Sequence, residues 1–341
     1  MRNNLFLELI LFLTVPYIKL FVLFWVMIKI YKKSAKSNGA GKLLELKRPA
    51  PGCWVNVVSP TEKEITELKE KYYLPSYLIK DCLDSDSLPR LEKDLDHNLS
   101  LILLKVPFHS DTSVTTIPFG IVFSPKKNYV FTISSAEANA VEKILSGTAK
   151  HLVTDDKALF FNYITKRLIR SYMRELNVTE NEISVAESSI NKSFQNKEVI
   201  LLLSLQKTLV YFRTSIVGNK KVLSKVISSK IFSATDEEKE LIEDLSVDMD
   251  EAQQLVTIYS EIIANMITAY NSLVSNNFNS ILKFLALITV AISIPTMVAS
   301  FYGMNIDLPL QQTHEAFLVV VLFAILATGG VLAFFKYKNW V

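Results

Sequence analysis

Tyr302, Gly303, Met304 and Asn305 form a short stretch in which an uncharged apolar run gives way to polar residues. We expect the glycine to let the backbone turn sharply there. An asparagine side chain presents a neutral carbonyl oxygen and an NH₂ group. A ring of such carbonyls could accept hydrogen bonds from the water shell of Mg²⁺, an ion that dehydrates reluctantly. The stretch therefore has the chemistry of a filter for a hydrated cation, whereas in isolation the same turn is typical of an ordinary loop.

A set of seven residues that precede this turn would form one stripe along a helix. Steps of three and four separate them, which is the heptad spacing of a single helix face. All but one are small or polar, and in lipid such a stripe must face protein or water. Two interpretations stay open, namely tight packing between helices through small residues, and the wall of a pore with Asn305 at its mouth. This polar stripe consists of Asn279, Leu282, Ala286, Thr289, Ser293, Thr296 and Ser300.

Two uncharged runs cover 284–306 and 316–335, and the turn stands at the end of the first. Each is about 20 residues long, the length that crosses about 30 Å of hydrocarbon as a helix. The alternative is a pair of buried core helices, but uncharged runs of this length are rare in soluble cores. The runs therefore predict two membrane spans close to the C-terminus.

The charges around the two runs predict their orientation. Lys283 precedes the first run, and Lys336 and Lys338 follow the second. The segment between the runs carries Asp307 and Glu315 and has no Lys or Arg. Because positive flanks stay in the cytoplasm, both flanks are predicted to be cytoplasmic, and two spans are consistent with this.

The composition indicates a soluble body joined to a few spans. The chain has 341 residues, 50% of them hydrophobic, and a mean hydropathy of +0.26. A net charge of +3 argues against nucleic acid as the main partner. Neither the two cysteines nor the four scattered histidines have metal-ligand spacing, which argues against a zinc enzyme. No Walker-type Gly-Lys-Ser/Thr motif is present either, so we expect no enzymatic activity and no organic cofactor.

The N-terminal segment allows two interpretations. Residues 5–28 are apolar but include Glu8, Pro16 and Lys19, which makes them a poor third span or an uncleaved anchor. Residues 27–31 alternate as an edge strand does, so a soluble domain could begin there. Residues 1–26 are then either an added anchor or an extension upstream of the true start, and we prefer the extension.

The region that follows is predicted to be α/β, and the region after it to be helical. Thr61 with Glu64 forms a capping box that begins a short helix, and Thr235 with Glu238 repeats the pattern. The third long helix has no clear stop before Phe301, so it would span about 65 residues, or about 100 Å. Strands are predicted at 27–31, 42–46, 53–58, 100–106, 115–123 and 129–133, short helices at 61–71, 75–83 and 136–146, and long helices at 155–192, 196–231 and 235–301.

With these features together, the sequence resembles the CorA family of divalent-cation transporters. The family signature YGMN stands at 302–305 between the last two spans, Pro295-Thr296 lies upstream, and the basic aromatic end FKYKNW covers 335–340. The resemblance covers most of the chain from Met27 onward. It implies a funnel-shaped homopentamer with a cytoplasmic α/β domain, a long α-helical stalk and two C-terminal transmembrane helices.

The expected organisation combines this resemblance with the patterns above. It comprises an extension or anchor (1–26), a cytoplasmic α/β domain (27–150), a helical stalk (151–278), a pore-lining span (279–301), an external loop (302–315), a second span (316–335) and a basic tail (336–341). The bulk of the chain and its C-terminus would lie in the cytoplasm beneath the cell membrane.

The resemblance also implies roles for particular residues. Asn279 would stand at the cytoplasmic entrance, Leu282 and Leu285 would form an apolar gate, Thr296 would lie partway along, and Asn305 would form the filter. Leu285 lies one residue off the polar stripe. The external loop lacks the acidic MPEL-like segment that is frequent in the family.

Control of the pore is implied by two acidic residues. Family members bind a regulatory cation between subunits through a stalk Asp and an α/β-domain Asp, which correspond to Asp244 and Asp81; a neighbouring family acid is Lys80 here. The simpler interpretation of the acids around Asp244 is a solvated helix face. This acidic stripe consists of Glu237, Glu240, Asp244, Asp248 and Glu251.

Three functions follow as hypotheses. The leading one is a CorA-type channel for hydrated Mg²⁺, in which Mg²⁺ is both the transported and the regulatory ion. The second is transport of Zn²⁺, Co²⁺ or Ni²⁺ by a member of the same superfamily. Absence of a His or Cys cluster near the turn argues mildly against these softer ions, although His314 lies in the loop. The third is a non-conducting, membrane-anchored coiled-coil scaffold.

Overall fold

The computed structural model describes most of the chain as two compact units. The first ends at Ile263, and the second covers Ala264–Val341. Residues 1–26, for which the sequence left an anchor and an extension open, lie outside the described residues, as does part of the helix predicted at 136–146. The described residues are 28–33, 43–110, 114–124, 128–138, 141, 144–145, 151–190, 196–229, 231–232, 235–306 and 315–338.

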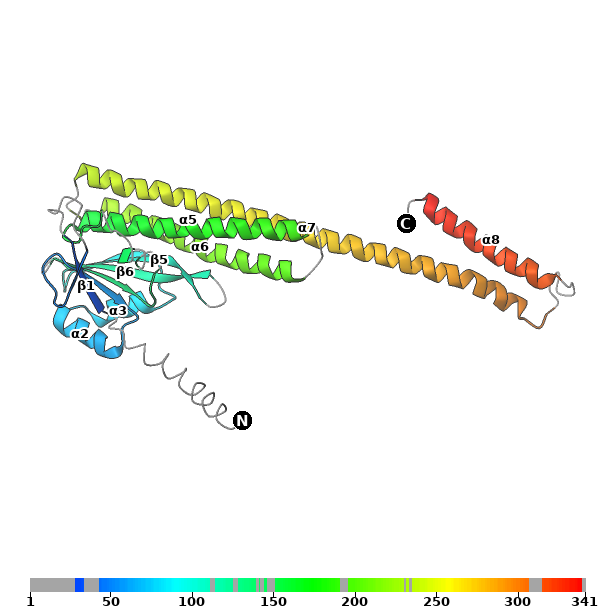
Figure 1. Cartoon of the computed structure of the whole chain (residues 1–341), viewed down its shortest axis with the longest axis horizontal. Coiled ribbons are helices and arrows are strands. Elements are labelled where there is room, and N and C mark those ends of the chain that lie inside the picture. Colours follow the sequence, from blue (N-terminus) through cyan, green and yellow to red (C-terminus); the bar gives the residue numbers. More distant parts are fainter. Residues whose placement is uncertain are drawn as a thin grey trace, which may run out of the picture. The chain divides into compact units, whose positions relative to one another are not determined.

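A seven-stranded sheet forms the centre of the first unit (Figure 1). Among the described strands only β3 and β7 pair in parallel, and the remaining neighbours are antiparallel. In spatial order the strands are β2 (Leu44–Leu46), β1 (Ile28–Lys32), β3 (Trp54–Val58), β7 (Tyr129–Ser134), β6 (Val114–Ser124), β5 (Leu99–His109) and β4 (Arg90–Asp94).

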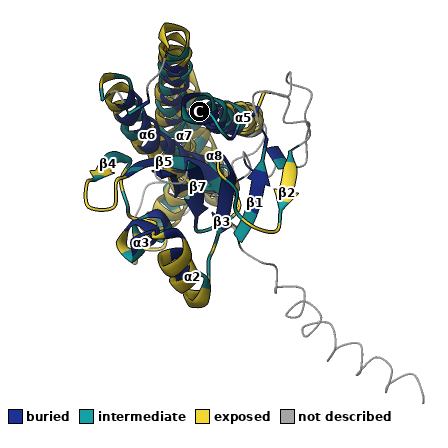
Figure 2. Cartoon of the chain, turned by 90° about the vertical axis from the view of Figure 1, so that its left-hand side faces the viewer, coloured by how far each residue is buried: buried dark blue, intermediate teal, exposed yellow. Residues whose placement is uncertain are grey.

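Two short helices, α2 (Glu62–Tyr72) and α3 (Ser76–Leu83), cover one face of this sheet (Figure 2). The predicted capping box begins α2, because the Thr61 backbone N–H donates to Glu64 Oε2 at 2.9 Å and the Glu64 N–H donates to Thr61 Oγ1 at 3.4 Å. Leu68 of α2 and Ile79 of α3 are fully buried against the strands. Burial of this apolar face is the main force that holds the two helices on the sheet.

The opposite face is covered by α5 (Lys157–Ile190) and α6 (Asn196–Ser228) (Figure 2). Trp54 is fully buried there, with its ring centroid 5.6 Å from that of Phe160 in α5. The indole Nε1–H donates to Thr132 Oγ1 at 2.7 Å, and that hydroxyl donates to Asn56 Oδ1 at 2.8 Å. The polar groups of this buried layer are therefore satisfied, as the low dielectric of a protein interior requires.

Asn219 of α6 forms hydrogen bonds with the backbone of β5 beyond the end of the pairing between β4 and β5. The pairing of β4 with β5 runs from Leu99 to Leu103, so the backbone of Lys105 has no β4 partner. Asn219 Oδ1 accepts from the Lys105 N–H and Asn219 Nδ2 donates to the Lys105 carbonyl, both at 2.8 Å. Gly218 permits this approach, since a Cβ there would lie 2.7 Å from Pro89 Cγ.

A single helix, α7 (Asp236–Tyr302), runs through both units. Two contacts tie its first part to α5: Asn162 Nδ2 donates to the Leu241 carbonyl at 2.7 Å, and the Tyr259 hydroxyl donates to Glu180 Oε2 at 3.0 Å. Burial, and then the Glu180 carboxylate, raise the pKa of Tyr259 to about 12, so its hydroxyl keeps its proton. The buried seam on α7 consists of Ile242, Leu245, Met249, Ala252, Val256, Tyr259 and Ile263.

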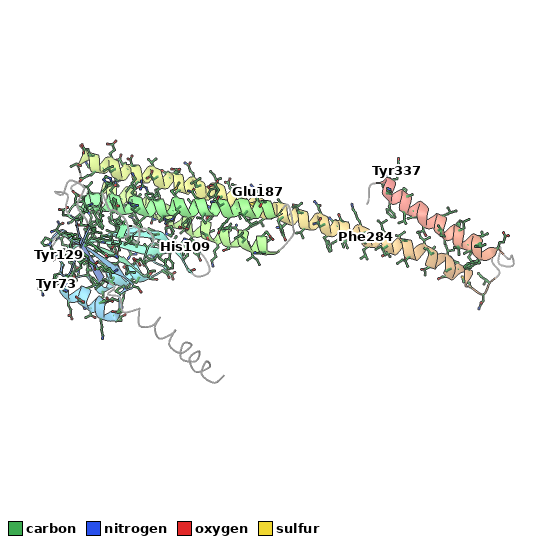
Figure 3. The ribbon with its side chains drawn as sticks, in the orientation of Figure 1. Tyr73, His109, Tyr129, Glu187, Phe284 and Tyr337 are labelled. Atoms are coloured by element: carbon green, nitrogen blue, oxygen red, sulfur yellow. The ribbon has the colours of Figure 1, made fainter. Side chains whose placement is uncertain are left out.

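The second unit contains the rest of α7 and α8 (Ala316–Tyr337). Its apolar side chains are largely uncovered: Phe284 of α7 is 62% exposed and Tyr337 of α8 is 84% exposed (Figure 3). By length and composition three helices of the described part are able to cross a membrane, namely Lys197–Ser228, Asp236–Tyr302 and Phe317–Tyr337. The first lies within α6, which packs on the sheet, so we assign the spans to α7 and α8.

Most predicted elements are present with their ends shifted by a few residues, and the third long helix begins and ends within one residue of its prediction. The clear omission is β4, whose sequence RLEKD is mostly polar. It pairs with β5 along one edge and is only partly buried, so it has no alternating apolar pattern from which a strand could be predicted.

We predict that Asn219→Ala destabilises the first unit. The partly buried N–H of Lys105 would lose its acceptor, and an unsatisfied donor costs up to about 1–3 kcal/mol where water does not reach it. The variant should melt at a lower temperature by circular dichroism in detergent. Asn181→Ala, at an exposed position of α5, is the control and should melt as the wild type does; equal melting of the two variants would contradict this role for Asn219.

Candidate functional site

The predicted filter turn lies at the C-terminal end of α7. The Gly303 N–H donates to the Ala299 carbonyl at 2.9 Å, and the Met304 N–H donates to the Phe301 carbonyl at 3.2 Å. Helical hydrogen bonding therefore continues through Gly303 and tightens in the last turn. Met304 and Asn305 are exposed beyond it.

The chain turns at Gly303 without the left-handed backbone conformation that glycine often supplies. Among the described glycines only Gly52 has a positive φ, so Gly303 does not use the left-handed region that is open mainly to glycine. A Cβ at Gly303 would lie 3.3 Å from the Ala299 carbonyl oxygen. In this structure the missing side chain therefore relieves crowding against the last helical turn, and the chain turns at Gly303 and bends through residues 304–306.

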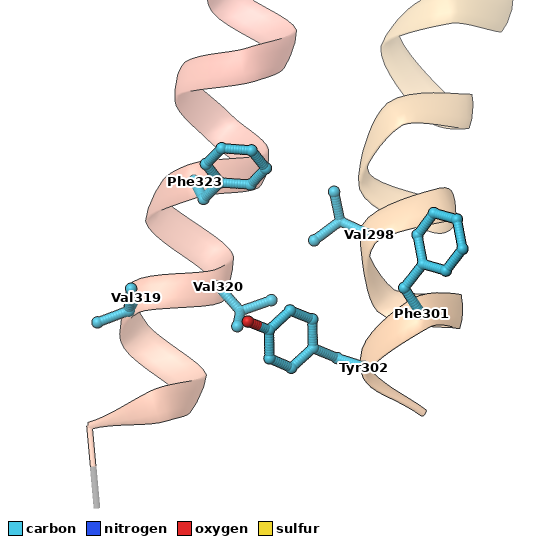
Figure 4. A pocket seen from close by; sticks show the side chains of 6 residues that line it. All are labelled: Val298, Phe301, Tyr302, Val319, Val320 and Phe323. Carbon is cyan, nitrogen blue, oxygen red and sulfur yellow. The ribbon is translucent and has the colours of Figure 1, made fainter. Parts of the chain in front are cut away.

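Tyr302 joins the turn to α8. Its ring extends from the end of α7 toward Val320, and Val298 lies one turn earlier on the same side of α7 (Figure 4). With Phe323 these side chains line an apolar pocket of about 290 Å³ between the two helices. An aromatic ring between two spans holds the end of the first against the start of the second.

The polar stripe lies on the side of α7 that α8 leaves uncovered. At about 100° per residue, its mean direction differs by roughly 150° from that of the half-buried residues. All seven residues of the stripe are exposed within the chain. From residue 287 onward, the half-buried residues of α7 are Leu287, Val290, Ala291, Ile294, Pro295, Val298 and Tyr302.

Two threonines of the stripe are oriented by their own helix. The Thr289 hydroxyl donates to the Leu285 carbonyl at 2.9 Å, and the Thr296 hydroxyl donates to the Ile292 carbonyl at 2.7 Å. Each hydroxyl proton is thereby engaged, and the oxygen lone pairs remain available as acceptors. An exposed row of acceptors suits the hydrogens of a cation's water shell.

The two apolar residues proposed for a gate are also uncovered. Leu282 is 46% exposed and Leu285 is 57% exposed. Three residues apart on a helix, they differ in direction by about 60°, so Leu285 lies beside the stripe of which Leu282 is a part. Their role as a gate stays a prediction.

The two proposed regulatory acids lie in different layers of the first unit. Asp81 is on α3, which covers one face of the sheet, and Asp244 is on α7, which packs with α5 beyond the other face (Figure 2). One chain therefore does not bring the two carboxylates together. In the described part of the chain, no group of three or more His, Cys, Asp or Glu side chains is placed to hold a metal ion. A site that uses both acids requires two copies of the chain.

Arg90 of β4 is a participant that the sequence analysis missed. Its guanidinium contacts the Asp81 carboxylate through Nη2, and its Nε donates to Glu92 Oε2 at 3.0 Å. All three side chains are about one-third exposed. Arg90 and Glu92 belong to the strand that was not predicted, so the sequence offered no reason to place this cation beside Asp81. By contrast, Asp244 is exposed and forms no ion pair with a described residue.

The comparisons with known proteins agree on one family. The family described as "CorA-like Mg2+ transporter protein" matches residues 50–337. The cobalt/magnesium transport protein CorA of Methanocaldococcus jannaschii is 27% identical over 293 residues, which cover 84% of this chain and 91% of that protein. The cobalt/magnesium transport protein CorA of Thermotoga maritima is 21% identical over 317 residues, which cover 90% of this chain and 88% of that protein.

A solved structure supports the same assignment. The complete structure of the CorA magnesium transporter from Methanocaldococcus jannaschii matches with a TM-score of 0.81 at 25% identity, and the match covers 94% of this chain and 100% of that one. The likeness thus includes the layered α/β unit, the long helices and the apolar C-terminal helix. Together with the family match, which covers most of the chain, it confirms the resemblance found in the sequence: this chain belongs to the CorA-like Mg²⁺ transporter family, a family of transporters rather than enzymes.

Proposed function

We propose that this chain forms a membrane channel that carries hydrated Mg²⁺ into the cytoplasm. The observation that carries the proposal is the polar stripe on the uncovered face of a membrane-spanning helix, which leads to the exposed Asn305. Several copies arranged in a ring, five in keeping with the family resemblance, would enclose the stripe and line a water-filled path. The α/β unit and the C-terminus would lie in the cytoplasm.

The membrane potential is a sufficient driving force for such a channel. A divalent cation gains about 4.6 kcal/mol per 100 mV of inside-negative potential, twice the value for a unit charge. The polar stripe and Asn305 offer neutral acceptors, which would hold the water shell without removing it. Influx would then need neither ATP nor an organic cofactor.

The proposed control of the channel depends on carboxylates at the contact between subunits. Cytoplasmic Mg²⁺ that bridges Asp244 of one subunit and Asp81 of the next would favour a closed, symmetric ring, since the unscreened carboxylates repel each other. When Mg²⁺ falls, these contacts would loosen and the apolar constriction at Leu282 would widen and fill with water. The contact between Arg90 and Asp81 adds a condition to this scheme, because Mg²⁺ must compete with a positive charge that is part of the chain.

A second cation is favoured by a specific comparison. The relatives from Methanocaldococcus jannaschii and Thermotoga maritima are both named cobalt/magnesium transport proteins. We therefore include Co²⁺ beside Mg²⁺ as a candidate cargo of this chain. Zn²⁺ and Ni²⁺ serve as further competitors in the transport experiment.

We predict that Asn305→Ala abolishes Mg²⁺ uptake. Without its carbonyl, the mouth of the path no longer offers acceptors to the hydrated ion. Proteoliposomes that contain a Mg²⁺-sensitive dye should fluoresce under an inside-negative potential with wild type and not with the variant. Asn271→Ala, at an exposed α7 position before the apolar run, is the matched control, and uptake that survives Asn305→Ala would contradict the filter.

Loss of both regulatory acids should make the channel less sensitive to cytoplasmic Mg²⁺. In the double variant Asp81→Ala/Asp244→Ala no carboxylate pair remains for the ion to bridge. Current through excised patches should then persist at Mg²⁺ concentrations that close the wild type. An unchanged dependence on Mg²⁺ would refute a role for this pair.

Loss of the positive charge of Arg90 should have the opposite effect and make the channel more sensitive to cytoplasmic Mg²⁺. Arg90→Gln removes the positive charge beside Asp81, so Mg²⁺ should bind there more tightly. An exposed ion pair contributes up to about 1 kcal/mol, so the closing concentration should fall by up to about fivefold. Arg213→Gln, on the exposed side of α6, should leave it unchanged, and a higher closing concentration in Arg90→Gln would show that Arg90 does not compete with Mg²⁺.

A further inference from the structure

A second cavity, remote from the polar stripe in the sequence, lies in the first unit between α5 and the beginning of α7. Its volume is about 410 Å³, and its lining includes His151, Tyr163, Lys166, Arg167, Arg170 and Leu241. This size is within the range of small-molecule sites, about 300–1,000 Å³. We call it the basic pocket.

The cations of the basic pocket come from one face of α5. Tyr163, Lys166, Arg167 and Arg170 follow at steps of three, one and three residues, so their side chains are neighbours on the helix. None of the three cations forms an ion pair with a carboxylate in the described part of the chain. Three unneutralised cations around a concavity attract an anion, which points to a ligand with several negative charges.

Arg167 is held in place before any ligand binds. Its Nη2 donates to the Tyr163 hydroxyl at 3.0 Å, and its guanidinium carbon lies 5.3 Å from the centroid of that ring. A guanidinium fixed in this way loses little conformational freedom when it binds a phosphate oxygen. Arg170 is exposed and Lys166 is half-buried, so both can adjust to the ligand.

The far wall of the pocket is fixed by a contact between helices. The bond from Asn162 Nδ2 to the Leu241 carbonyl holds α7 against α5, and Leu241 itself is 40% exposed. Leu159 adds a second apolar side chain to the lining. The site thus combines cations on one side with an apolar, part-aromatic surface, on which a planar base can rest.

Two carboxylates of the acidic stripe border the same region. Glu237 stands four residues before Leu241 and Asp244 three residues after it, which places both on the same side of α7 as Leu241. These charges would repel a bare polyanion. A polyanion that carries a divalent cation would instead be attracted by both helices. The basic side chains of α5 would attract its phosphates, and the carboxylates of α7 would attract the cation through its bound water.

We propose that the basic pocket binds the magnesium complex of a nucleoside polyphosphate. The phosphates contact Lys166, Arg167 and Arg170, and the base lies against Leu159 and Leu241. This binding does not depend on ion conduction, so it can be measured separately from transport. Because the pocket joins α5 to the first turns of α7, a bound nucleotide strengthens the attachment of that helix.

The test measures binding of ATP to the full-length protein in detergent by calorimetry, with Mg²⁺ and with EDTA. Saturable binding that weakens in EDTA is expected. Lys166→Gln/Arg170→Gln should weaken it at least about tenfold, since two charge-assisted hydrogen bonds are lost. Arg213→Gln on α6 is the matched control and should bind as the wild type does. Absence of saturable binding to wild type, or equal binding by the double variant, would overturn the proposal.

Two further arms separate other occupants from a nucleotide. Vesicles that contain phosphatidylinositol 4,5-bisphosphate should not displace ATP. Displacement would identify a lipid headgroup as the source of the phosphates and overturn the nucleotide proposal.

The mass of the assembly is measured by light scattering for wild type and the double variant. If the double variant dissociates and wild type binds no ATP, the pocket is a contact between subunits. Mg²⁺ uptake by the double variant without nucleotide should equal wild type, so failure of this proposal leaves the transport proposal intact.

Discussion

The apolar seam of α7 is the interaction on which both units of this molecule depend. From Ile242 to Ile263 it is buried in steps of three and four, which attaches the helix to the α/β unit by hydrophobic burial. Continued in the same heptad phase, the seam passes through Leu287, Ile294 and Val298, the half-buried side that includes the residues next to α8. The phase is not buried throughout, since Leu273 and Phe284 share it and are 38% and 62% exposed, so α7 is uncovered between its two packed stretches.

Uncovered polar residues of α7 follow a heptad repeat of their own. Glu237, Glu240, Asp244 and Glu251 of the acidic stripe share the heptad phase of the whole polar stripe, from Asn279 to Ser300. A strict seven-residue repeat keeps such residues on one side only where the helices supercoil, since a straight α-helix drifts by about 20° per heptad. Shared phase therefore places the acidic stripe and the polar stripe on one side of α7 only if copies of α7 supercoil around each other.

Much of the fold could be predicted from local sequence patterns. The rest depends on contacts between residues that are distant in the sequence. The capping boxes at Thr61 and Thr235, and the absence of proline from residue 155 to residue 294, were sufficient to predict where these elements begin. The Asn219 amide that bonds Lys105, 114 residues away, has no local signature. Arg90 beside Asp81 depends on a polar edge strand that periodicity does not reveal. The filter turn was predicted from its position between two apolar runs. The hydrogen bond from the Gly303 N–H to the Ala299 carbonyl is a detail that residue type alone does not specify.

The choice between a pore wall and simple helix packing depends on which polar groups the helix can satisfy by itself. Thr289 and Thr296 donate to carbonyls of their own helix, so either surrounding would tolerate them. Asn279 and Asn305 differ, because their amides form no hydrogen bond with a described residue and both are exposed. Four polar valences on each asparagine need water or a partner, and lipid offers neither. Both stand at the ends of the stripe, so a water-filled path along the stripe would open at Asn279 on one side and at Asn305 on the other.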